Sequence, residues 1–270
     1  MKGWAEERVV KELGYLNLNE GPTSRESHYS RHLLFLRWLN RTFSKKVKII
    51  DIGGGSGTLL HTILYYEKSP FKMDELENYS CYDLNSYCIE NGKETFKDYQ
   101  NVKFIEQDLD NDAIKEKVDV VYVDSTLTMF EKPYDVLYNL LNISDYVVLN
   151  RTPLNDIPQD KKEQFKWGGM TSHSPLWKFS VHQMENFTKS YGWGMNVINI
   201  TTPPLNSAHD VLSPHEYVMK KYAYKNGLLT PFPNEKLNYI DNLRQFNQSI
   251  HTLFGTAFHE TLQGYLTIMY

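Results

Sequence analysis

The sequence predicts an α/β fold with a parallel, doubly wound sheet. The first observation is a change of pattern at Val47, after which short apolar runs alternate with longer amphipathic stretches as far as Asn150. Strands buried on both faces read as continuous apolar runs, and parallel neighbours need crossover connections, which are usually helical. The second observation is a glycine-rich turn directly after the first apolar run, where a strand must turn sharply into a helix.

Five strands separated by helices form the core of this predicted sheet. They are expected at KVKIIDI (46–52), YSCYD (79–83), VKFIEQD (102–108), VDVVYVD (118–124) and DYVVLN (145–150). Helical spacing of apolar residues predicts helices at about 58–67, 86–97 and 134–142, and two earlier ones at 4–16 and 25–40.

The pattern breaks after Asn150. Residues 151–180 contain Pro153, Pro158 and Pro175 and the pair Gly168-Gly169, a composition typical of a loop. A loop of this length is usually functional or disordered, and its two tryptophans favour a functional one. Beyond it the sequence predicts a helix over about 180–191, a strand pair at 194–200 and 215–224, and helical structure around 237–254.

Charge and apolar patterning exclude several classes of protein. The 29 basic and 33 acidic residues give a net charge of −4, and no basic stripe with interleaved aromatics points to DNA or RNA. No apolar stretch approaches the ~18 residues that span a bilayer, and the charged N-terminus does not read as a signal peptide. Cys81 and Cys88 predict neither a disulfide framework nor a zinc site. We therefore expect a cytoplasmic protein with reduced thiols.

The first predicted strand runs into Asp51-Ile52-Gly53-Gly54-Gly55-Ser56-Gly57. Glycines at alternate positions let the backbone turn sharply and approach a ligand closely, although a tight turn without a ligand is an alternative. A dinucleotide fingerprint is disfavoured, because Thr58 stands where it needs glycine or alanine and an anionic pyrophosphate gains nothing from Asp51. A carboxylate at this place suits a cationic ligand.

This segment resembles motif I of the class I S-adenosylmethionine-dependent methyltransferases, and the resemblance covers about residues 47–150. It implies S-adenosylmethionine as cofactor and a Rossmann-like sheet of seven strands, mostly parallel with one antiparallel strand. The strand pair at 194–200 and 215–224 looks like the terminal hairpin of this family. A narrower similarity, to small methyltransferases of bacterial surface-polysaccharide clusters, rests on Asn150-Arg151-Thr152-Pro153-Leu154 and the aromatic segment ending in Ser174-Pro175-Leu176-Trp177.

The resemblance also implies which residues hold the cofactor. In the family, acidic residues at the ends of the second and third strands meet the ribose hydroxyls and the adenine amino group, and Asp83 and Asp108 stand at these places. Each aspartate taken alone is more often a strand-end cap, but ligands of open α/β sheets bind at this edge. The expected cofactor-binding residues are Asp51, Gly53, Gly55, Gly57, Asp83, Leu84, Asp108, Leu109, Asp124 and Ser125.

The candidate catalytic residues are His173, His28 and Asp124. A hydroxyl acceptor needs a base, and His173 lies in the aromatic segment after the fifth strand, although it could equally be a surface histidine. His28 belongs to the kind of helical extension that often covers the cofactor in this family, but it could equally cap or pack. Asp124 could act as the base or merely orient the methyl donor.

Acceptor contacts are expected from Tyr29, Arg151, Trp167 and Trp177, with a surface ion pair as the alternative for Arg151. No metal is expected. Metal-dependent members of the family tend to show an acidic pair followed by Asp-Asn near the later strands, where this chain reads Leu149-Asn150-Arg151. Asp124 together with Asn150 keeps a metal site open.

The sequence therefore predicts a methyltransferase for a small polar acceptor, in particular one that O-methylates a sugar or sugar-linked metabolite in carbohydrate biosynthesis. The alternatives are a catalytically silent binding module and a nicotinamide-dependent oxidoreductase. The oligomeric state is not predicted. The expected parts of its single domain are a helical N-terminal extension (1–45), a cofactor-binding core (46–150), an acceptor loop (151–180), a sheet hairpin (181–225) and a C-terminal extension (226–270).

Overall fold

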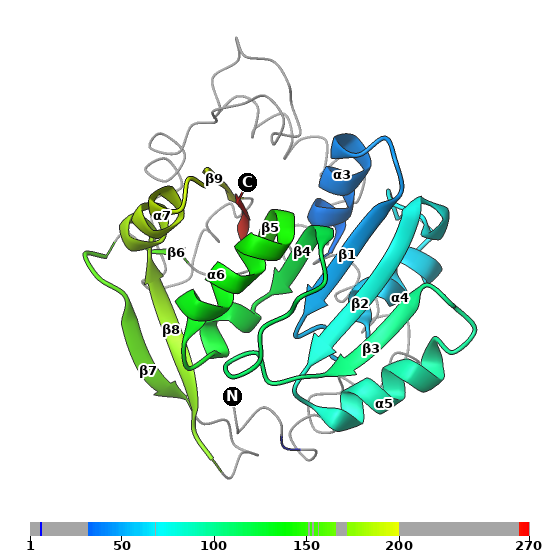
Figure 1. The fold of residues 1–270 in the computed structure, drawn as a ribbon, viewed down its shortest axis with the longest axis horizontal. Helices are drawn as coiled ribbons and strands as arrows, with labels where there is room; N and C mark the ends of the chain where they lie inside the picture. The colour runs from blue at the N-terminus through cyan, green and yellow to red at the C-terminus, as the bar shows by residue number, and fades with distance from the viewer. Residues whose placement is uncertain are drawn as a thin grey trace, which may run out of the picture.

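A mostly parallel sheet of seven strands forms the centre of the protein (Figure 1). The computed structural model describes residues 6, 32–67, 69–150, 152, 154–155, 157–165, 172–199 and 265–269. In spatial order the strands are β3 (Val102–Glu106), β2 (Leu76–Asp83), β1 (Val47–Ile52), β4 (Val118–Asp124), β5 (Ser144–Asn150), β10 (Tyr265–Met269) and β9 (Met195–Asn199). The first five are parallel, and β10 is antiparallel to both of its neighbours. The predicted Rossmann-like α/β architecture is confirmed.

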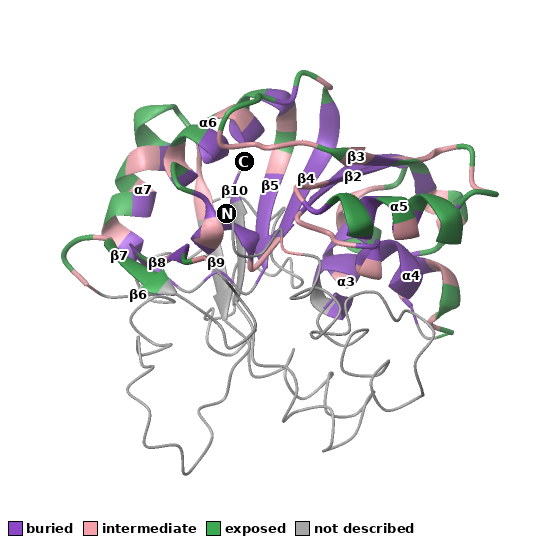
Figure 2. Ribbon diagram, turned by 90° about the horizontal axis from the view of Figure 1, so that it is seen from below, coloured by how far each residue is buried: buried purple, intermediate pink, exposed green. Residues whose placement is uncertain are grey.

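Helices cover both faces of the sheet, which gives three layers (Figure 2). Alternate side chains of a strand point to opposite faces, so Ile49 packs in one apolar cluster and Ile50 in the other. The first cluster also contains side chains of α3 (Leu33–Thr42), α4 (Thr58–Tyr65) and α5 (Ser86–Thr95). The second contains side chains of η3 (Thr126–Met129), α6 (Pro133–Ile143) and α7 (Val181–Ser190). A short 3-10 helix, η2 (Met73–Glu75), precedes β2.

The strand order reverses between β1 and β4. From β1 the chain passes through α4 and α5 to β2 and β3 on one side, whereas β4, α6 and β5 extend the sheet on the other side. The register pairs Asp51 with Tyr122, and Asp124 with Asn150, so the carboxyl ends of β1, β4 and β5 lie next to one another. In open α/β sheets, ligands bind outside the carboxyl ends of the strands at this reversal.

Residues 151–180 are not the plain loop that the sequence predicts. They contain a small sheet of β6 (Leu154–Asn155), β8 (Ser174–Ser180) and β7 (Lys161–Phe165), in this spatial order. The β7 sequence KKEQF has no apolar alternation that could signal a strand. Its strand conformation is set by antiparallel pairing with β8, a contact that a local pattern does not encode.

The described antiparallel neighbour of β9 is β10, a strand that was not predicted. It comes from the expected C-terminal extension and pairs with both β9 and β5. The expected strand at 215–224 and the expected helix at 237–254 lie outside the described residues, as does the expected helix at 4–16 apart from residue 6. Within the part of the chain that is described, no helix is both long and apolar enough to cross a membrane.

Candidate functional site

The glycine turn joins β1 to α4 at the point where the strand order reverses. Gly53, Gly55 and Gly57 have φ angles of 67°, 58° and 91°, in the left-handed region that favours glycine. A Cβ on Gly53 would lie 2.1 Å from Thr126 Oγ1, so this glycine is required by packing. In the part of the chain that the structure describes, no atom would lie within 4 Å of a Cβ on Gly55. Gly55 therefore faces open space, as a backbone that is approached by a ligand must.

Asp51 packs against the buried side of this turn. Its side chain is only 1% exposed, and its Oδ2 accepts a 2.6 Å hydrogen bond from the Tyr79 hydroxyl. Burial, and next the charge of Asp51, raise the pKa of Tyr79, so the tyrosine stays a donor. A Cβ on Gly54 would lie 2.4 Å from Asp51 Oδ2, which shows how closely the carboxylate packs against the turn.

Asp83 connects the end of β2 to the same turn. Its Oδ2 accepts a 3.0 Å hydrogen bond from the Gly55 amide, and its Oδ1 accepts a 2.8 Å bond from the Asn85 amide. Burial raises the pKa of Asp83, and the hydrogen bonds from the backbone act in the opposite direction. The side chain is half-buried. A ligand that contacts Gly55 would therefore meet Asp83 beside it.

Asp108 lies in the turn after β3. Its Oδ1 accepts a 3.1 Å bond from the Asp110 amide, and its Oδ2 accepts a 2.9 Å bond from Asn111 Nδ2. The Gln107 amide donates to the Asp83 carbonyl over 3.0 Å and so brings the ends of β2 and β3 together. Asp108 thus caps its own loop, which was the alternative interpretation, while it lies at the edge where a ligand is expected.

The end of β4 has the most unusual backbone of the site. Ser125 has a φ of 59°, and it is the one residue other than glycine with a positive φ in the described part of the chain. Backbone strain of this kind costs about 1–3 kcal/mol and is concentrated at functional sites. Its amide donates to the Asn150 carbonyl over 2.9 Å, and Asp124 Oδ1 accepts a 3.0 Å bond from Asn150 Nδ2.

The structure thus brings the expected cofactor-binding residues to one edge of the sheet. Asp51 and Gly57 are buried below it. The others are half-buried, at the boundary between core and solvent: Gly53, Gly55, Asp83, Leu84, Asp108, Leu109, Asp124 and Ser125. Several carboxylates at one edge produce a negative potential that favours a cationic ligand.

The same architecture occurs in known methyltransferases. No family model matches the chain, and no curated protein matches its sequence. Among solved structures it is similar to the plantazolicin methyltransferase BpumL in complex with a monoazolic desmethylPZN analog and SAH, with a TM-score of 0.54, 14% identity and coverage of 99% of this chain and 92% of that chain. An O-methyltransferase from a trans-AT PKS multienzyme of Brevibacillus brevis, in complex with S-adenosyl-L-homocysteine, gives a TM-score of 0.53 at 14% identity, over 95% of this chain and 77% of that one.

A third similar structure is the methyltransferase in complex with the Haloferax volcanii Trm112 methyltransferase activator. Its TM-score is 0.53 at 12% identity, over 98% of this chain and 96% of that chain. The chain has the class I methyltransferase fold. At identities this low the similarity shows the fold alone, and the activity has to be argued from the residues of the site.

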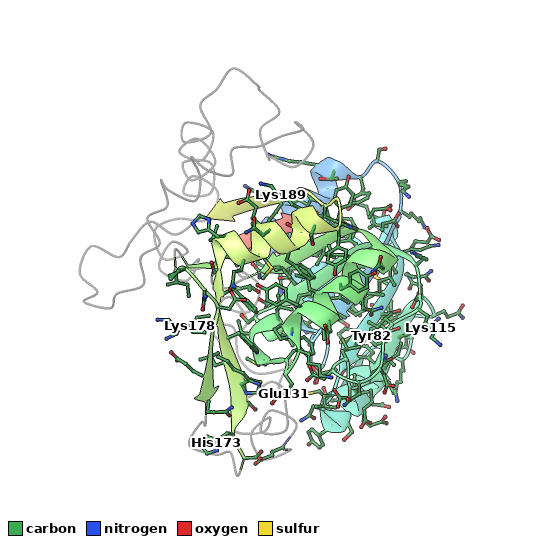
Figure 3. All side chains as sticks on the ribbon, turned by 60° about the vertical axis from the view of Figure 1, so that its left-hand side comes forward. Tyr82, Lys115, Glu131, His173, Lys178 and Lys189 are labelled. Atoms are coloured by element: carbon green, nitrogen blue, oxygen red, sulfur yellow. The ribbon has the colours of Figure 1, made fainter. Side chains whose placement is uncertain are left out.

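The segment that the sequence predicts as an acceptor loop contains β7 and β8. His173 is exposed and directly precedes β8. Figure 3 shows it at the end of the β7–β8 pair that lies away from Lys189 and α7. The neighbouring Ser172 donates two hydrogen bonds to Glu6 Oε1, from its amide over 3.1 Å and from its hydroxyl over 3.0 Å. A residue of the N-terminal segment therefore lies beside this end of the small sheet.

Trp177 attaches the small sheet to the main domain. Its Nε1 donates a 2.8 Å hydrogen bond to the Phe130 carbonyl, directly after η3. Lys162 Nζ lies 5.5 Å from the centre of the tryptophan ring and also pairs with Glu131 over 2.6 Å. The half-buried Trp177, which the sequence predicts to contact the acceptor, therefore joins the small sheet to the main domain.

The remaining predicted residues lie outside the described part of the chain: His28, Tyr29, Arg151 and Trp167. In the described residues, no group of three or more His, Cys, Asp or Glu side chains could hold a metal ion. Asn150 was expected in the motif that follows the fifth strand and in an open metal site, and its hydrogen bond to Asp124 was not predicted. The shared position of Asp124 and Asn150 at the ends of consecutive strands is the one signal that could have revealed their contact.

Proposed function

We propose that this protein is an S-adenosylmethionine-dependent methyltransferase that acts on a small polar acceptor. The observation that carries the proposal is the arrangement of Gly55 and Asp83. Gly55 faces open space at a φ of 58°, and its amide is tied to the carboxylate at the end of the neighbouring strand. This pair offers a ligand both a close backbone approach and a hydrogen-bond acceptor beside it.

The residues of the site fit S-adenosylmethionine. Open space at Gly55 leaves room for a ligand where any side chain would intrude. Asp83 is placed to accept hydrogen bonds from ribose hydroxyls, and Asp108 and Leu109 stand further along the edge to meet the base. The cofactor is a cation, which suits the carboxylates of this edge. The structures of BpumL and of the Brevibacillus brevis enzyme, both with bound S-adenosylhomocysteine, support the assignment.

The chain contributes mainly alignment to the reaction. When bound, S-adenosylmethionine supplies a methyl group on a positively charged sulfur. Displacement at this methyl carbon is in line, so the protein must hold the acceptor atom opposite the sulfur and exclude water. Asp124 and Ser125, at the end of β4 and next to the glycine turn, are the described residues best placed to do so.

A polar acceptor is supported by two buried hydroxyl groups. Thr152 follows the end of β5, and Ser174 follows His173; both are 0% exposed, and neither side-chain oxygen has a hydrogen-bond partner among the described residues. A buried hydroxyl without a hydrogen-bond partner lowers the free energy of unfolding by about 1–3 kcal/mol, so such groups usually serve a function. We favour a sugar or sugar-linked metabolite that is methylated on oxygen. The polar groups of such an acceptor would supply the missing hydrogen-bond partners.

His173 is our candidate for the base that such a hydroxyl acceptor requires, with His28 and Asp124 as alternatives. Arg151, Tyr29 and Trp167 stay proposals for acceptor binding. We place the reaction in the cytoplasm, in agreement with the two buried, free thiols Cys81 and Cys88.

Mass spectrometry tests the activity directly. The protein is incubated with S-adenosylmethionine that carries a deuterated methyl group and with a panel of sugars and nucleotide-linked sugars. We expect one acceptor to gain one labelled methyl group, and His173→Ala to reduce kcat by about 10²–10⁴-fold. His182→Ala, at a histidine of α7, is the matched control and should keep the wild-type rate. A protein that binds S-adenosylhomocysteine but methylates nothing in a broad panel would favour the silent binding module.

A further inference from the structure

A buried chain of hydrogen bonds runs from the beginning of α3 to the end of β4. His32 Nδ1 lies 3.0 Å from the Tyr122 hydroxyl, Asn150 Nδ2 lies 2.7 Å from the same hydroxyl, and Asn150 Nδ2 also lies 3.0 Å from Asp124 Oδ1. His32, Tyr122 and Asn150 are 1%, 0% and 3% exposed. None of these three residues belongs to the predicted cofactor or acceptor set.

The chemistry of the Asn150 side chain decides which atoms donate in these hydrogen bonds. The two hydrogens of Asn150 Nδ2 point to the Tyr122 oxygen and to the Asp124 carboxylate. At the contact between Tyr122 and His32 the tautomer of the histidine sets which group donates. Turning over the amide of Asn150 would oppose its oxygen to the Asp124 carboxylate.

Asn150 holds the end of β4 through its backbone as well. Its carbonyl accepts the hydrogen bond of the Ser125 amide, and in the sheet register it is the direct partner of Asp124. One residue thus contacts both Asp124 and the strained Ser125. A left-handed serine persists only when its surroundings over-determine it, and Asn150 provides two of the required contacts.

We infer that Asn150 is a positioning residue, which fixes the Asp124–Ser125 turn and acts on the ligand through Asp124, while Tyr122 and His32 fix the amide of Asn150. The first half of this inference concerns the geometry of the protein alone. The second half rests on the proposed function, because it assumes that Asp124 lies beside a bound cofactor.

The geometry is tested by NMR spectroscopy of the isotope-labelled full chain without ligand. The backbone shifts and the amide-to-Hα coupling of Ser125 report its φ. Asn150→Ala removes the side-chain bond to Asp124 and keeps the backbone bond to the Ser125 amide, so we expect the φ of Ser125 to shift away from 59°; in Tyr122→Phe, which keeps the ring stacked on Phe35, we expect a smaller shift in the same direction. Asn139→Ala is the matched control, because Asn139 also makes two amide hydrogen bonds, to the Ile114 backbone, and we expect it to leave Ser125 unchanged.

The effect on the ligand is tested by a double-mutant cycle with S-adenosylhomocysteine as the probe. Asn150→Ala and Asp124→Ala should each weaken binding by about tenfold, on the scale of one hydrogen bond to a charged group. Adding Asn150→Ala to Asp124→Ala should weaken the binding of S-adenosylhomocysteine no further, because Asn150 acts through Asp124. A merely structural role would produce the same loss in both backgrounds.

The outcomes separate the inference from the proposed function. An unchanged Ser125 in a folded Asn150→Ala protein overturns the inference, and so do additive losses in the cycle or single variants that bind as well as the wild type. If the wild-type protein itself does not bind S-adenosylhomocysteine, the proposed function fails. The geometry of Ser125 in Asn150→Ala and Asn139→Ala then decides by itself whether Asn150 holds the turn.

Discussion

The proposed cofactor side and the proposed acceptor side of this protein are built from different kinds of strand. On the proposed cofactor side, β1 and β4 are mostly apolar and buried, and β1 pairs with β2 on one side and with β4 on the other. On the proposed acceptor side, the polar strand β7 pairs with β8, and the small sheet joins the domain through Leu154 and Phe179 in the second apolar cluster and through side-chain hydrogen bonds such as that of Trp177.

These attachments come from residues far apart in sequence. Asp160 accepts a 2.6 Å bond from the Tyr134 hydroxyl of α6, and Trp177 and Lys162 contact Phe130 and Glu131 after η3. The proposed cofactor site is thus formed by the backbone and strand ends of the main sheet, whereas the proposed acceptor segment is a separate small sheet joined to it by side chains. Changes on the acceptor side should therefore leave the cofactor site intact.

The largest effect is expected at the glycine turn. Gly55→Val should abolish S-adenosylhomocysteine binding in a folded protein, because its side chain would occupy the space that the ligand needs. Calorimetry checks the binding, and circular dichroism checks the fold. Gly192→Val is the matched control: Gly192 also has a positive φ, of 79°, and a Cβ there would also meet no atom within 4 Å. Gly192→Val should introduce the same backbone strain and still bind S-adenosylhomocysteine normally. Equal affinities of the two variants for this ligand would contradict the assignment of the glycine turn to the cofactor site.

A smaller loss is expected at the end of β2. Asp83→Ala should weaken binding by about 1.5–3 kcal/mol, a roughly 10- to 150-fold rise in Kd, because it removes hydrogen bonds to a charged acceptor. Asp119→Ala is the control, since Asp119 is a buried aspartate at the other end of β4 that accepts hydrogen bonds from the Lys48 amide and Lys45. A change at Asp83 below roughly 0.3 kcal/mol would remove it from the ribose role.

The same carboxylate predicts a pH dependence. Burial raises the pKa of Asp83, so it takes up a proton at a higher pH than an ordinary aspartate does. Affinity for S-adenosylhomocysteine should fall as the pH falls through this raised value, because the protonated group is a weaker acceptor. The same shift makes protonation of Asp83 favour the folded state, so this group does not cause acid unfolding. Asp83→Asn should lack this pH dependence; an identical profile in that variant would assign it to another group.

The smallest effect is expected at the attachment of the small sheet. Trp177→Phe keeps an aromatic ring and removes the hydrogen bond to Phe130, which should cost about 1 kcal/mol of unfolding free energy in urea. Trp193→Phe, at a tryptophan packed against the same apolar cluster, should cost less. Affinity for S-adenosylhomocysteine should stay unchanged in both. A clear loss of affinity in Trp177→Phe would show that the two sides are coupled.

The same contrast explains how far the sequence predicts this structure. The expected strand at 118–124 has the bounds of β4, because a buried parallel strand carries its own continuous apolar signal. The glycine turn follows a strand of this kind and was located for the same reason, and the position of Asp83 at a strand end was expected from the family resemblance. The strand β7 has no such signal, and β10 pairs with a strand far earlier in the chain, so neither was predicted.

The buried chain from His32 to Asp124 shows the same limit within the site. His32 and Tyr122 are separated by 90 positions, and their contact exists only because α3 packs on the face of β4 that carries Tyr122. Ser125 was expected in the site from its place after β4, but its left-handed backbone, its hydrogen bond to Asn150 and its position at the start of η3 were not predicted. Strand ends can be placed from sequence, whereas the contacts between them require the packed fold.

Calorimetry of the wild-type protein with S-adenosylhomocysteine tests the central claim most directly. A methyltransferase cofactor site at the carboxyl edge of β1, β2 and β4 predicts a Kd of about micromolar order and a stoichiometry of about one. NADH titrated under the same conditions should give no heat of binding, because Thr58 and Asp51 do not suit a pyrophosphate. A folded protein that shows no binding of S-adenosylhomocysteine would contradict the claim.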